Sequence, residues 1–469
     1  MNYLNLLKLV SPEAILAATA IMALGLGLAR PGIRWLCPVV AAAGLIGSAV
    51  AVLALPTQAG LPHEMLVIDP LTSMFKVICL ALALFTVLSA SGDSARPNNG
   101  EYFAMILLAA VGLLILVGTE NLLMIFVGLE LIGLSLYVLC AFDKTSPRSA
   151  EAGLKYFLFG STASAFTLFG ISLIYGMCGA GSLREIAVFI GLHGMQPLLA
   201  AGLVLTLVGL GFKIAAAPFH LWAPDVYEAA PVSSAAFISS GSKVAAFVVL
   251  GKFLLVGFGL SSRWVPLVAL LSAASIIVGN VTALAQTSVR RLLGYSAVAH
   301  AGYTLLGLIG GGSEGFSATL FYTTVYAFTL VGAFSVIGAM ERHGVGDGIG
   351  DFTGLRARSP LLAGCLGIFI LSLAGLPPLP GFFGKFYLFL ALLHQGGMLW
   401  LVALALAGSL VSLYYYLAVL KAALVDEAPL SRIPLKAVDR VSILGLGVLI
   451  LALGFCPGIL LQRIIDSLH

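Results

Sequence analysis

The sequence predicts an all-α polytopic membrane protein with about fourteen transmembrane helices. Of its 469 residues, 60% are hydrophobic and 9% are charged, whereas soluble domains carry about 25% charged residues. The mean hydropathy is +1.09. Apolar runs of roughly 20 residues, the length that spans a bilayer, recur along almost the whole chain. The composition excludes an ordinary soluble enzyme, and a net charge of +4 without a dense basic block gives no support to nucleic-acid binding.

The spans follow from apolar runs that are bounded by charged, Gly-rich or Pro-rich breaks. Only Lys8 precedes the first run, and Arg30 and Pro31 end it, so we expect a membrane span there rather than a cleaved signal peptide. The expected spans are 12–29, 35–55, 70–90, 102–119, 121–141, 155–178, 197–222, 229–258, 264–287, 291–311, 316–340, 360–395, 398–422 and 440–462.

Two of these runs are too long and too interrupted to be plain helices. The seventh runs into prolines at 218, 224 and 231, and the twelfth into prolines at 377, 378 and 380. Proline removes a backbone donor and clashes with the preceding turn, and exposed backbone groups are tolerated at membrane depth only where they are buried in protein or line a wet cavity. We therefore predict two broken helices whose breaks face the interior of the bundle.

Broken helices at corresponding places in two halves indicate inverted repeats with a site near the membrane midplane. The breaks at Pro218 and Pro380 are five predicted helices apart, and an odd number of helices inverts the second unit. We expect N-terminal helices 1–3 in residues 1–101, a first repeat of helices 4–8 in 102–260, a second, inverted repeat of helices 9–13 in 261–425, and helix 14 in 426–469.

Basic loop residues are distributed unevenly between the two predicted sides. Loops after odd-numbered spans hold Arg30, Arg34, Arg96, Lys144, Arg148, Arg290, Arg291, Arg342, Arg356, Arg358, Lys421, Arg432, Lys436 and Arg440. The opposite side holds only Lys8, Arg184, Arg263 and Arg463. By the positive-inside rule we expect both termini on the non-cytoplasmic side, which also requires an even number of spans.

Several charged residues lie inside the predicted spans. A charge at the centre of a membrane helix costs roughly 2.5–3.5 kcal/mol on insertion scales and usually marks an ion or proton pathway. Lys213 and Lys385 lie at or beside the two breaks, and Lys243 follows the first break. Lysine suits proton transfer, because burial disfavours its charged form and a nearby carboxylate favours it. The alternative is that these lysines only cap carbonyl groups freed by the prolines.

Other charges leave two interpretations open. Glu130 has no basic partner on its own helix face, so its partner must come from another helix, in a proton path or in a structural ion pair. Lys155, at the start of its span, is either an interfacial anchor or functional. We expect Lys76 and Lys252 to extend toward an interface.

Histidines and cysteines give no metal pattern. His220 lies in the first break and His300 in the tenth span, and each is either a proton relay or a hydrogen-bonded core residue. Neither has a second histidine at ligand spacing, and the six cysteines form no CxxC. Nucleotide-binding glycine motifs are also missing. We therefore expect no metal and no cofactor in this chain.

Four sequence strings carry a resemblance to a known family. They are EAGLKYF at 151–157, KIAAAPFHLWAPDVYEAAP at 213–231, RLLGYSAVAHAGY at 291–303 and GLPPLPGFFGKF at 375–386. In this order they resemble the antiporter-like proton-pumping subunits of respiratory complex I, NADH-quinone oxidoreductase. The form PDVY followed by AP, and then SK at 242–243, is similar to the subunit N group.

The resemblance implies a proton-translocating subunit of an NADH:quinone oxidoreductase, a translocase whose redox chemistry occurs in other subunits. Glu130 matches the glutamate of helix five, Lys213 and Lys385 the lysines of the broken helices, Lys243 the linking lysine and Lys155 the lysine of helix six. With the two histidines already named, these residues form the expected proton relay.

The same resemblance implies where the rest of the machinery lies. NADH, FMN, iron–sulfur clusters and quinone are expected in other subunits. The expected partners are the antiporter-like subunit M, the small subunit K and the lipid bilayer, in a bacterial inner (plasma) membrane. The alternative is an Mrp-type cation/proton antiporter subunit, which predicts sodium-dependent transport and no association with redox subunits.

Overall fold

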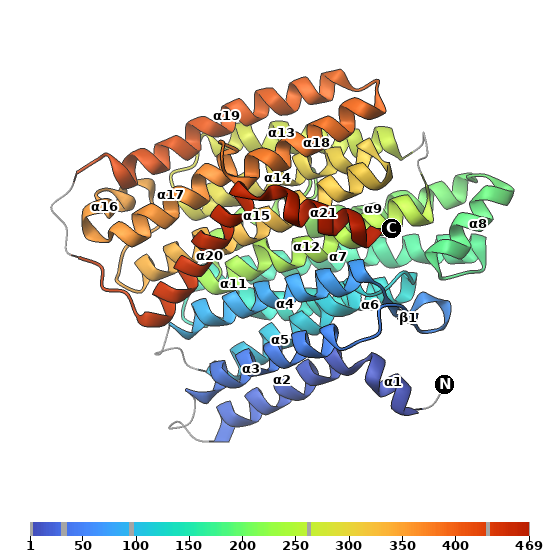
Figure 1. The fold of residues 1–469 in the computed structure, drawn as a ribbon, viewed down its shortest axis with the longest axis horizontal. Coiled ribbons are helices and arrows are strands. Elements are labelled where there is room, and N and C mark those ends of the chain that lie inside the picture. Colours follow the sequence, from blue (N-terminus) through green and yellow to red (C-terminus); the bar gives the residue numbers. More distant parts are fainter. Residues whose placement is uncertain (1–2, 30–34, 93–97, 260–263, 428–431, 469) are drawn as a thin grey trace.

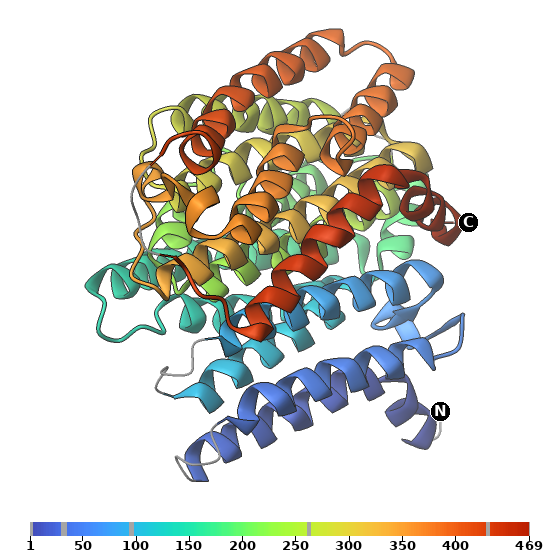
Figure 2. The same ribbon diagram turned by 60° about the vertical axis from the view of Figure 1, so that its left-hand side comes forward.

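The computed structural model describes residues 3–29, 35–92, 98–259, 264–427 and 432–468. Within these ranges the chain is almost entirely helical, and the long helices run side by side along one direction (Figures 1 and 2). Thirteen described helical segments are long and apolar enough to cross a membrane, and the broken pair α17–α18 makes a further crossing. The chain is an all-α multi-pass membrane protein, and the expected fold is confirmed.

The N-terminal part forms one edge of the bundle. Its elements are α1 (Tyr3–Leu9), α2 (Ser11–Ala29), α3 (Leu36–Leu53), the antiparallel hairpin β1 (Ala59–Gly60) and β2 (Val67–Ile68) with the 3-10 turn η2 (Pro62–Glu64) between them, α4 (Pro70–Ser91) and α5 (Asn99–Val117). Helices α2 and α5 approach closely because two glycines face each other. A Cβ on Gly27 would lie 2.6 Å from the Cα of Gly100, so only small residues allow this packing.

The middle of the chain contains the first broken helix. Its elements are α6 (Leu122–Cys140), α7 (Pro147–Cys178), α8 (Leu183–His193), α9 (Pro197–Ile214), α10 (Trp222–Ala229), α11 (Val232–Ser239), α12 (Gly241–Gly251), the π-helical turn η3 (Lys252–Gly257), α13 (Val265–Ala283), α14 (Val289–Gly310) and α15 (Gly312–Glu341). Helix α15 lies at the centre of the bundle, and its residues 315–340 are all buried.

The C-terminal part contains the second broken helix. Its elements are η4 (Ile349–Phe352), α16 (Leu355–Arg358), α17 (Pro360–Ala374), α18 (Pro380–Gln395), α19 (Leu399–Leu424), α20 (Ala437–Phe455) and α21 (Pro457–Leu468). The fourteenth predicted span ends at Phe455 rather than at 462, because Pro457 starts the separate helix α21. Helix α7 begins eight residues earlier than predicted, at Pro147, where the Ser146 hydroxyl accepts a hydrogen bond from the Ser149 amide at 3.3 Å.

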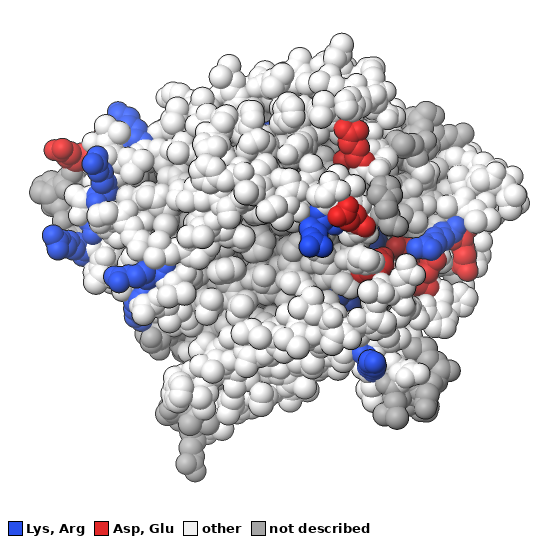
Figure 3. Space-filling model, in the orientation of Figure 1, with Lys and Arg blue, Asp and Glu red and all other residues white. Residues whose placement is uncertain are grey.

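Charged side chains gather at the two ends of the bundle, and the face shown in Figure 3 is otherwise uncharged. We call one end the hairpin end, formed by β1–β2, α8 and α21, and the other the basic end, formed by residues 143–148, 341–347, 354–358 and 432–440. Figure 1 shows α8 and the hairpin at the right and α16 at the left. The loop residues Arg30, Arg34, Arg96 and Arg263 lie outside the described residues.

The two breaks are alike in their burial, and at both the prediction is wrong in part. At the first, residues 215–217 are buried, but Pro218 and Leu221 are exposed. At the second, Leu379 and Pro380 are buried, but Pro377 and Pro378 are exposed at the surface of the bundle. This exposure leaves no backbone donor unpaired: the amides of Gly375, Leu376 and Leu379 bond to carbonyls of residues 371, 372 and 376, and proline has no N–H.

Candidate functional site

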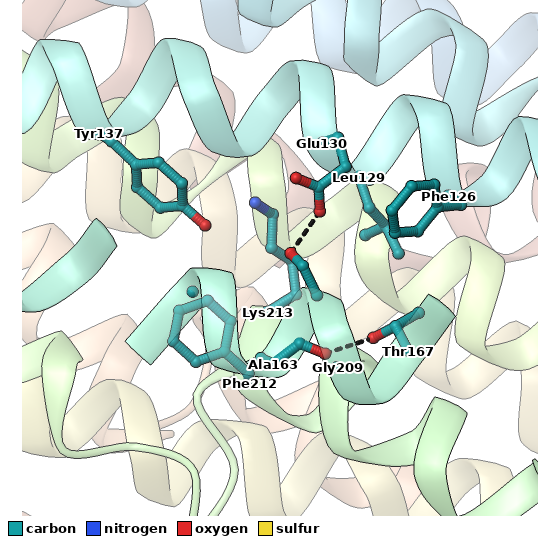
Figure 4. Close-up of a pocket in the computed structure, with 11 residues that line it drawn as sticks. Phe126, Leu129, Glu130, Tyr137, Ala163, Thr167, Gly209, Phe212 and Lys213 are labelled. Carbon is teal, nitrogen blue, oxygen red and sulfur yellow. Dashed lines mark hydrogen bonds between the residues drawn. The ribbon is translucent and has the colours of Figure 1, made fainter. Parts of the chain in front are cut away.

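The first part of the site is a small cavity between α6, α7 and α9. Glu130 from α6 and Lys213 from the end of α9 point into it, together with the hydroxyl of Tyr137 (Figure 4). The Ser164 hydroxyl from α7 donates a hydrogen bond to the Glu130 carboxylate. Among the described residues, Glu130 and Lys213 form no ion pair within 4.0 Å. The cavity of about 20 Å³ has room for one water molecule between them.

Local chain geometry places Lys213 at this position. Helix α9 ends at Ile214, and Ala215 takes a left-handed conformation with φ of 59°. The freed backbone groups find partners: the Ala217 amide donates to the Ser275 hydroxyl at 2.8 Å, and the Trp222 indole donates to the Phe212 carbonyl at 3.1 Å. The last turn of α9 is therefore fixed, and its lysine is 4% exposed.

Lys243 lies deeper, on α12, and is 1% exposed. Its ammonium group donates a hydrogen bond to the Ala297 carbonyl of α14 at 3.0 Å. It also lies 5.5 Å from the ring centroid of Tyr326 and 5.9 Å from that of Tyr227, where the ring faces attract a cation. One carbonyl and two rings thus replace the water that the amine loses on burial.

His300, one helical turn beyond Ala297 on α14, is the centre of a hydroxyl network. Its Nδ1 lies 2.6 Å from the Tyr322 hydroxyl, and its Nε2 lies 3.0 Å from the Tyr416 hydroxyl. The Tyr416 hydroxyl also bonds to Ser296. Both ring nitrogens therefore have a partner that can either donate or accept, and protonation of either nitrogen can be accommodated.

Lys385, on α18 just after the second break, is 4% exposed. Its ammonium group donates to the Ala374 carbonyl at the end of α17 at 3.0 Å and to the Ser409 hydroxyl of α19 at 2.9 Å. It lies 5.2 Å from the ring centroid of Tyr303. Capping of a freed carbonyl, the alternative considered from the sequence, is present here together with a hydroxyl partner.

The remaining two site residues lie apart from this buried series. Lys155 is partly exposed and pairs with Glu151 at 2.7 Å and with Asp225 at 2.9 Å. Asp225 also pairs with Arg291 at 2.8 Å, so the cluster connects α7, α10 and α14. His220 lies in the first break, and its Nδ1 is buried without a hydrogen-bond partner in the described part of the chain.

The expectation for two other lysines is wrong. Lys76 is 1% exposed and pairs with Glu13 of α2 at 2.6 Å. Lys252 is 2% exposed and lies 3.6 Å from Glu120. Neither side chain reaches the surface of the described structure, because each pairs with a buried carboxylate from a segment distant in sequence.

Sequence reasoning missed the hydroxyl groups that surround the buried lysines and His300. They belong to Tyr322, Tyr416, Ser296 and Ser409. One signal could have found Tyr416: three consecutive tyrosines, at 414–416, lie well inside an apolar run, whereas membrane tyrosines are enriched at the interfaces.

A larger cavity, of about 880 Å³, lies at the basic end. Arg290 forms part of its wall, where its guanidinium donates to the carbonyls of Tyr227, at 3.0 Å, and of Ala230, and pairs with Glu341 at 3.3 Å. Tyr227 separates this arginine from Lys243. Among the described residues, no three His, Cys, Asp or Glu side chains gather as metal ligands would.

Comparison with known proteins shows the family of the chain. The family described as NADH:quinone oxidoreductase/Mrp antiporter, TM, matches residues 119–412. NADH-quinone oxidoreductase subunit N 2 of Acidobacterium capsulatum is 43% identical, covering 98% of this chain and 99% of the relative. Subunit N of Moorella thermoacetica is 38% identical, covering 92% of this chain and 91% of the relative.

Solved structures share the whole fold. A chain of respiratory complex I from Thermus thermophilus with bound aureothin superposes with a TM-score of 0.82 at 34% identity, covering 96% of this chain and 98% of that one. A chain of the Mrp complex from Dietzia sp. gives a TM-score of 0.87 at 22% identity, covering 98% and 97%, and this likeness concerns the fold alone. The chain therefore belongs to the NADH:quinone oxidoreductase/Mrp antiporter membrane family, and within it to the subunit N group of the NADH-quinone oxidoreductases.

Proposed function

We propose that this chain moves protons across the membrane as a subunit of an NADH:quinone oxidoreductase, through Glu130, Lys213, Lys243, His300 and Lys385. One observation carries the proposal: three lysines, each at most 4% exposed, lie in the bundle interior together with a histidine that has hydroxyl partners on both ring nitrogens. Isolated charges are costly in this environment, and a row of them without a transported ion has no energetic advantage.

The first transfer is an exchange of partners at Glu130. In the present geometry its carboxylate accepts from Ser164 and leaves Lys213 without a direct ion pair. A water in the cavity between them connects the two groups. When the carboxylate approaches Lys213, the charged lysine is favoured. When it returns to Ser164, the lysine releases its proton toward Lys243.

The second half of the path runs from Lys243 to Lys385. Lys243 is bonded to the Ala297 carbonyl, which lies one turn from His300 on the same helix. The hydroxyls beside the imidazole, from Tyr322 and Tyr416, can pass a proton by reversing their hydrogen bonds. Tyr303 lies between His300 and Lys385 in the path, since its ring contacts both side chains.

We assign the electron chemistry to other subunits, which would hold NADH, FMN, iron–sulfur clusters and quinone, and we expect subunits M and K beside this chain. Residues 102–260 and 261–425 are proposed as the two inverted units, each with one broken helix.

The basic end would face the cytoplasm of a bacterial inner membrane. The cavity beside Arg290 is then a water-filled approach to Lys243 from that side. The partly exposed Lys155 and the buried His220 are proposed to support the relay from beside it.

The test is proton pumping by inverted membrane vesicles fuelled with NADH, from cells that carry Lys213→Met. Assembly of the complex is checked by blotting, and Lys421→Met, at a lysine side chain that is 70% exposed, is the matched control. We expect pumping and NADH oxidation to collapse in Lys213→Met while the control retains both. Unchanged pumping would refute the relay. Pumping that requires sodium and persists without redox subunits would favour the Mrp-type antiporter.

A further inference from the structure

A second group of buried charges lies at the hairpin end, outside the proposed relay. Glu13, Lys76, Glu120 and Lys252 are each at most 6% exposed. Glu13 pairs with Lys76 at 2.6 Å, and Glu120 pairs with Lys252 at 3.6 Å. The four side chains come from α2, α4, the α5–α6 connection and η3, which are distant in sequence.

The two pairs meet at the C-terminal end of α5. The Lys252 amine donates to the Val117 carbonyl at 3.2 Å. A Cβ added at Gly118 would lie 2.8 Å from Cε and 3.0 Å from Nζ of Lys76. Both amines therefore lie against the last turn of α5, where unpaired carbonyl groups carry partial negative charge, and the absence of a side chain at Gly118 makes room for Lys76.

The group continues to the surface through alternating charges. Arg184 of α8 pairs with Glu120 at 3.1 Å and with Glu64 at 3.3 Å. Ser182 donates a hydrogen bond to Glu64. The Arg184 side chain is 64% exposed, so the series leads from the buried Glu13 to the outside of the hairpin end. Figure 3 shows acidic and basic side chains gathered there.

Stability alone does not account for this arrangement. Replacing a buried ion pair by well-packed hydrophobic residues is often neutral or stabilising. Oε2 of Glu13 is buried and has no hydrogen-bond partner in the described part of the chain, and an unpaired buried acceptor is costly. Lys252 also begins a π-helical turn, a distortion that occurs often at functional sites.

The group is separate from the relay. Lys243 and Lys252 share the α12–η3 segment, but they are nine residues apart, about 13 Å along a helix, and residues 244–251 between them are all apolar or glycine. Other charges that face the group are Asp69, which caps α4 and acts electrostatically on Lys252, and the pair His63–Glu185 at 3.8 Å.

We propose that Glu13, Lys76, Lys252, Glu120, Arg184 and Glu64, called here the hairpin-end charge cluster, form a second proton-transfer path that opens at the hairpin end. Two kinds of step alternate: a charged lysine gives its Nζ proton to a paired carboxylate, so that both become neutral, and the resulting carboxylic acid gives the proton to the next, neutral lysine, so that both regain their charges. Arg184 keeps its proton throughout and holds Glu120 and Glu64 in place. Lys76 changes partner between Glu13 and Glu120 across Gly118. The proposal rests on the proposed function in that the chain moves protons in step with NADH oxidation, so that blocking either path halts the coupled cycle and lowers uptake through both. It uses none of the relay residues.

The experiment uses the assembled complex in inverted vesicles. The double variant Glu13→Gln/Lys76→Met removes both charges of one pair, so that no unpaired buried charge remains. Gly118→Ala keeps every charge but forces the Lys76 amine away from the end of α5. Lys8→Met, at an exposed lysine in the last turn of α1, is the control. We expect at least a fivefold loss of NADH-driven proton uptake in both test variants and none in the control.

An infrared pH titration detects protonation of a carboxyl group directly, which a purely structural ion pair would not show. In the purified complex, Glu13→Gln should remove one carbonyl-stretch band of a protonated carboxyl. Unchanged proton uptake in Gly118→Ala, or an unchanged band in Glu13→Gln, would overturn the proposal. Both results decide it even if the double variant fails to assemble. Loss of uptake here together with normal uptake in Lys213→Met would refute the relay instead and support this path.

Discussion

Three consecutive tyrosines on α19 make a graded test of the His300 network. Tyr414 is 70% exposed. The Tyr415 hydroxyl is buried and donates to Asn280 at 3.1 Å. The Tyr416 hydroxyl is buried, lies 3.0 Å from His300 Nε2 and also bonds to Ser296. Replacing each in turn by phenylalanine removes one oxygen atom and keeps the ring.

The magnitude follows from the hydrogen bonds lost. Tyr416→Phe leaves the buried Nε2 of His300 without its partner, which costs about 1–3 kcal/mol. If proton transfer passes through this nitrogen, that cost enters the barrier, and at 1.36 kcal/mol per tenfold the pumping rate falls about 5- to 150-fold. Tyr415→Phe also breaks a buried hydrogen bond, to Asn280, and removes a neighbour of the Tyr416 hydroxyl, but both hydroxyl partners of the imidazole remain. We therefore expect a similar loss of stability with a smaller change in rate.

The assay measures NADH-driven proton uptake by vesicles, normalised to assembled complex, alongside the thermal stability of the purified complex. We expect the pumping rate to be highest in Tyr414→Phe, lower in Tyr415→Phe and lowest in Tyr416→Phe. Only the Tyr416→Phe rate should fall fivefold or more below that of the unchanged protein. Equal rates for the Tyr415 and Tyr416 variants would refute the reasoning, because the loss would then follow stability rather than contact with His300.

Three further changes are tested by the same measurements. Ser164→Ala removes the donor that holds Glu130 away from Lys213, so we expect pumping to fall about fivefold, the effect of losing one hydrogen bond. The control Thr162→Ala, at an exposed hydroxyl bonded within its own helix, should have no effect. Asp225→Asn breaks two partly exposed ion pairs, each worth at most about 1 kcal/mol, and should lower pumping no more than about fivefold per pair; a complete loss would contradict a supporting role for this cluster. Gly279→Ala would place a Cβ 2.4 Å from the Ala299 amide nitrogen of α14, so blotting should show little assembled complex.

The sequence predicted those features that depend on a single segment. Apolar runs predicted the crossings, and the prolines near 218 and 380 predicted the two interruptions, because both signals act within one helix. The burial of Lys213, Lys243 and Lys385 followed for the same reason, since each lies inside an apolar run.

Features that depend on which helices meet were not predicted. Glu13 and Lys76 are 63 residues apart, and Tyr416 lies 116 residues from His300; no periodicity in one helix specifies such a partner. The short helices α8 and α21 and the hairpin were missed because they are shorter than a span. The exposed prolines at 377 and 378 were predicted to be buried, since the pattern does not show that the neighbouring amides already have acceptors.

Most serine and threonine hydroxyls of the central helix α15 donate their hydrogen bonds to backbone carbonyls of the same helix. Ser317, Thr323, Thr324 and Thr329 each donate to the carbonyl four residues earlier. Such bonds leave the outer surface of a helix to van der Waals contacts. A small rotation or slide of α15 within the bundle would therefore break few interhelical hydrogen bonds.

Two tyrosines on this helix connect such a motion to the buried charges. Tyr322 contacts His300 through its hydroxyl, and the Tyr326 ring lies 5.5 Å from the Lys243 ammonium. A close-packed interior transmits displacement instead of absorbing it. A rotation of α15 would thus change the contacts of His300 and of Lys243 at the same moment, so one helix motion could coordinate the protonation of both groups.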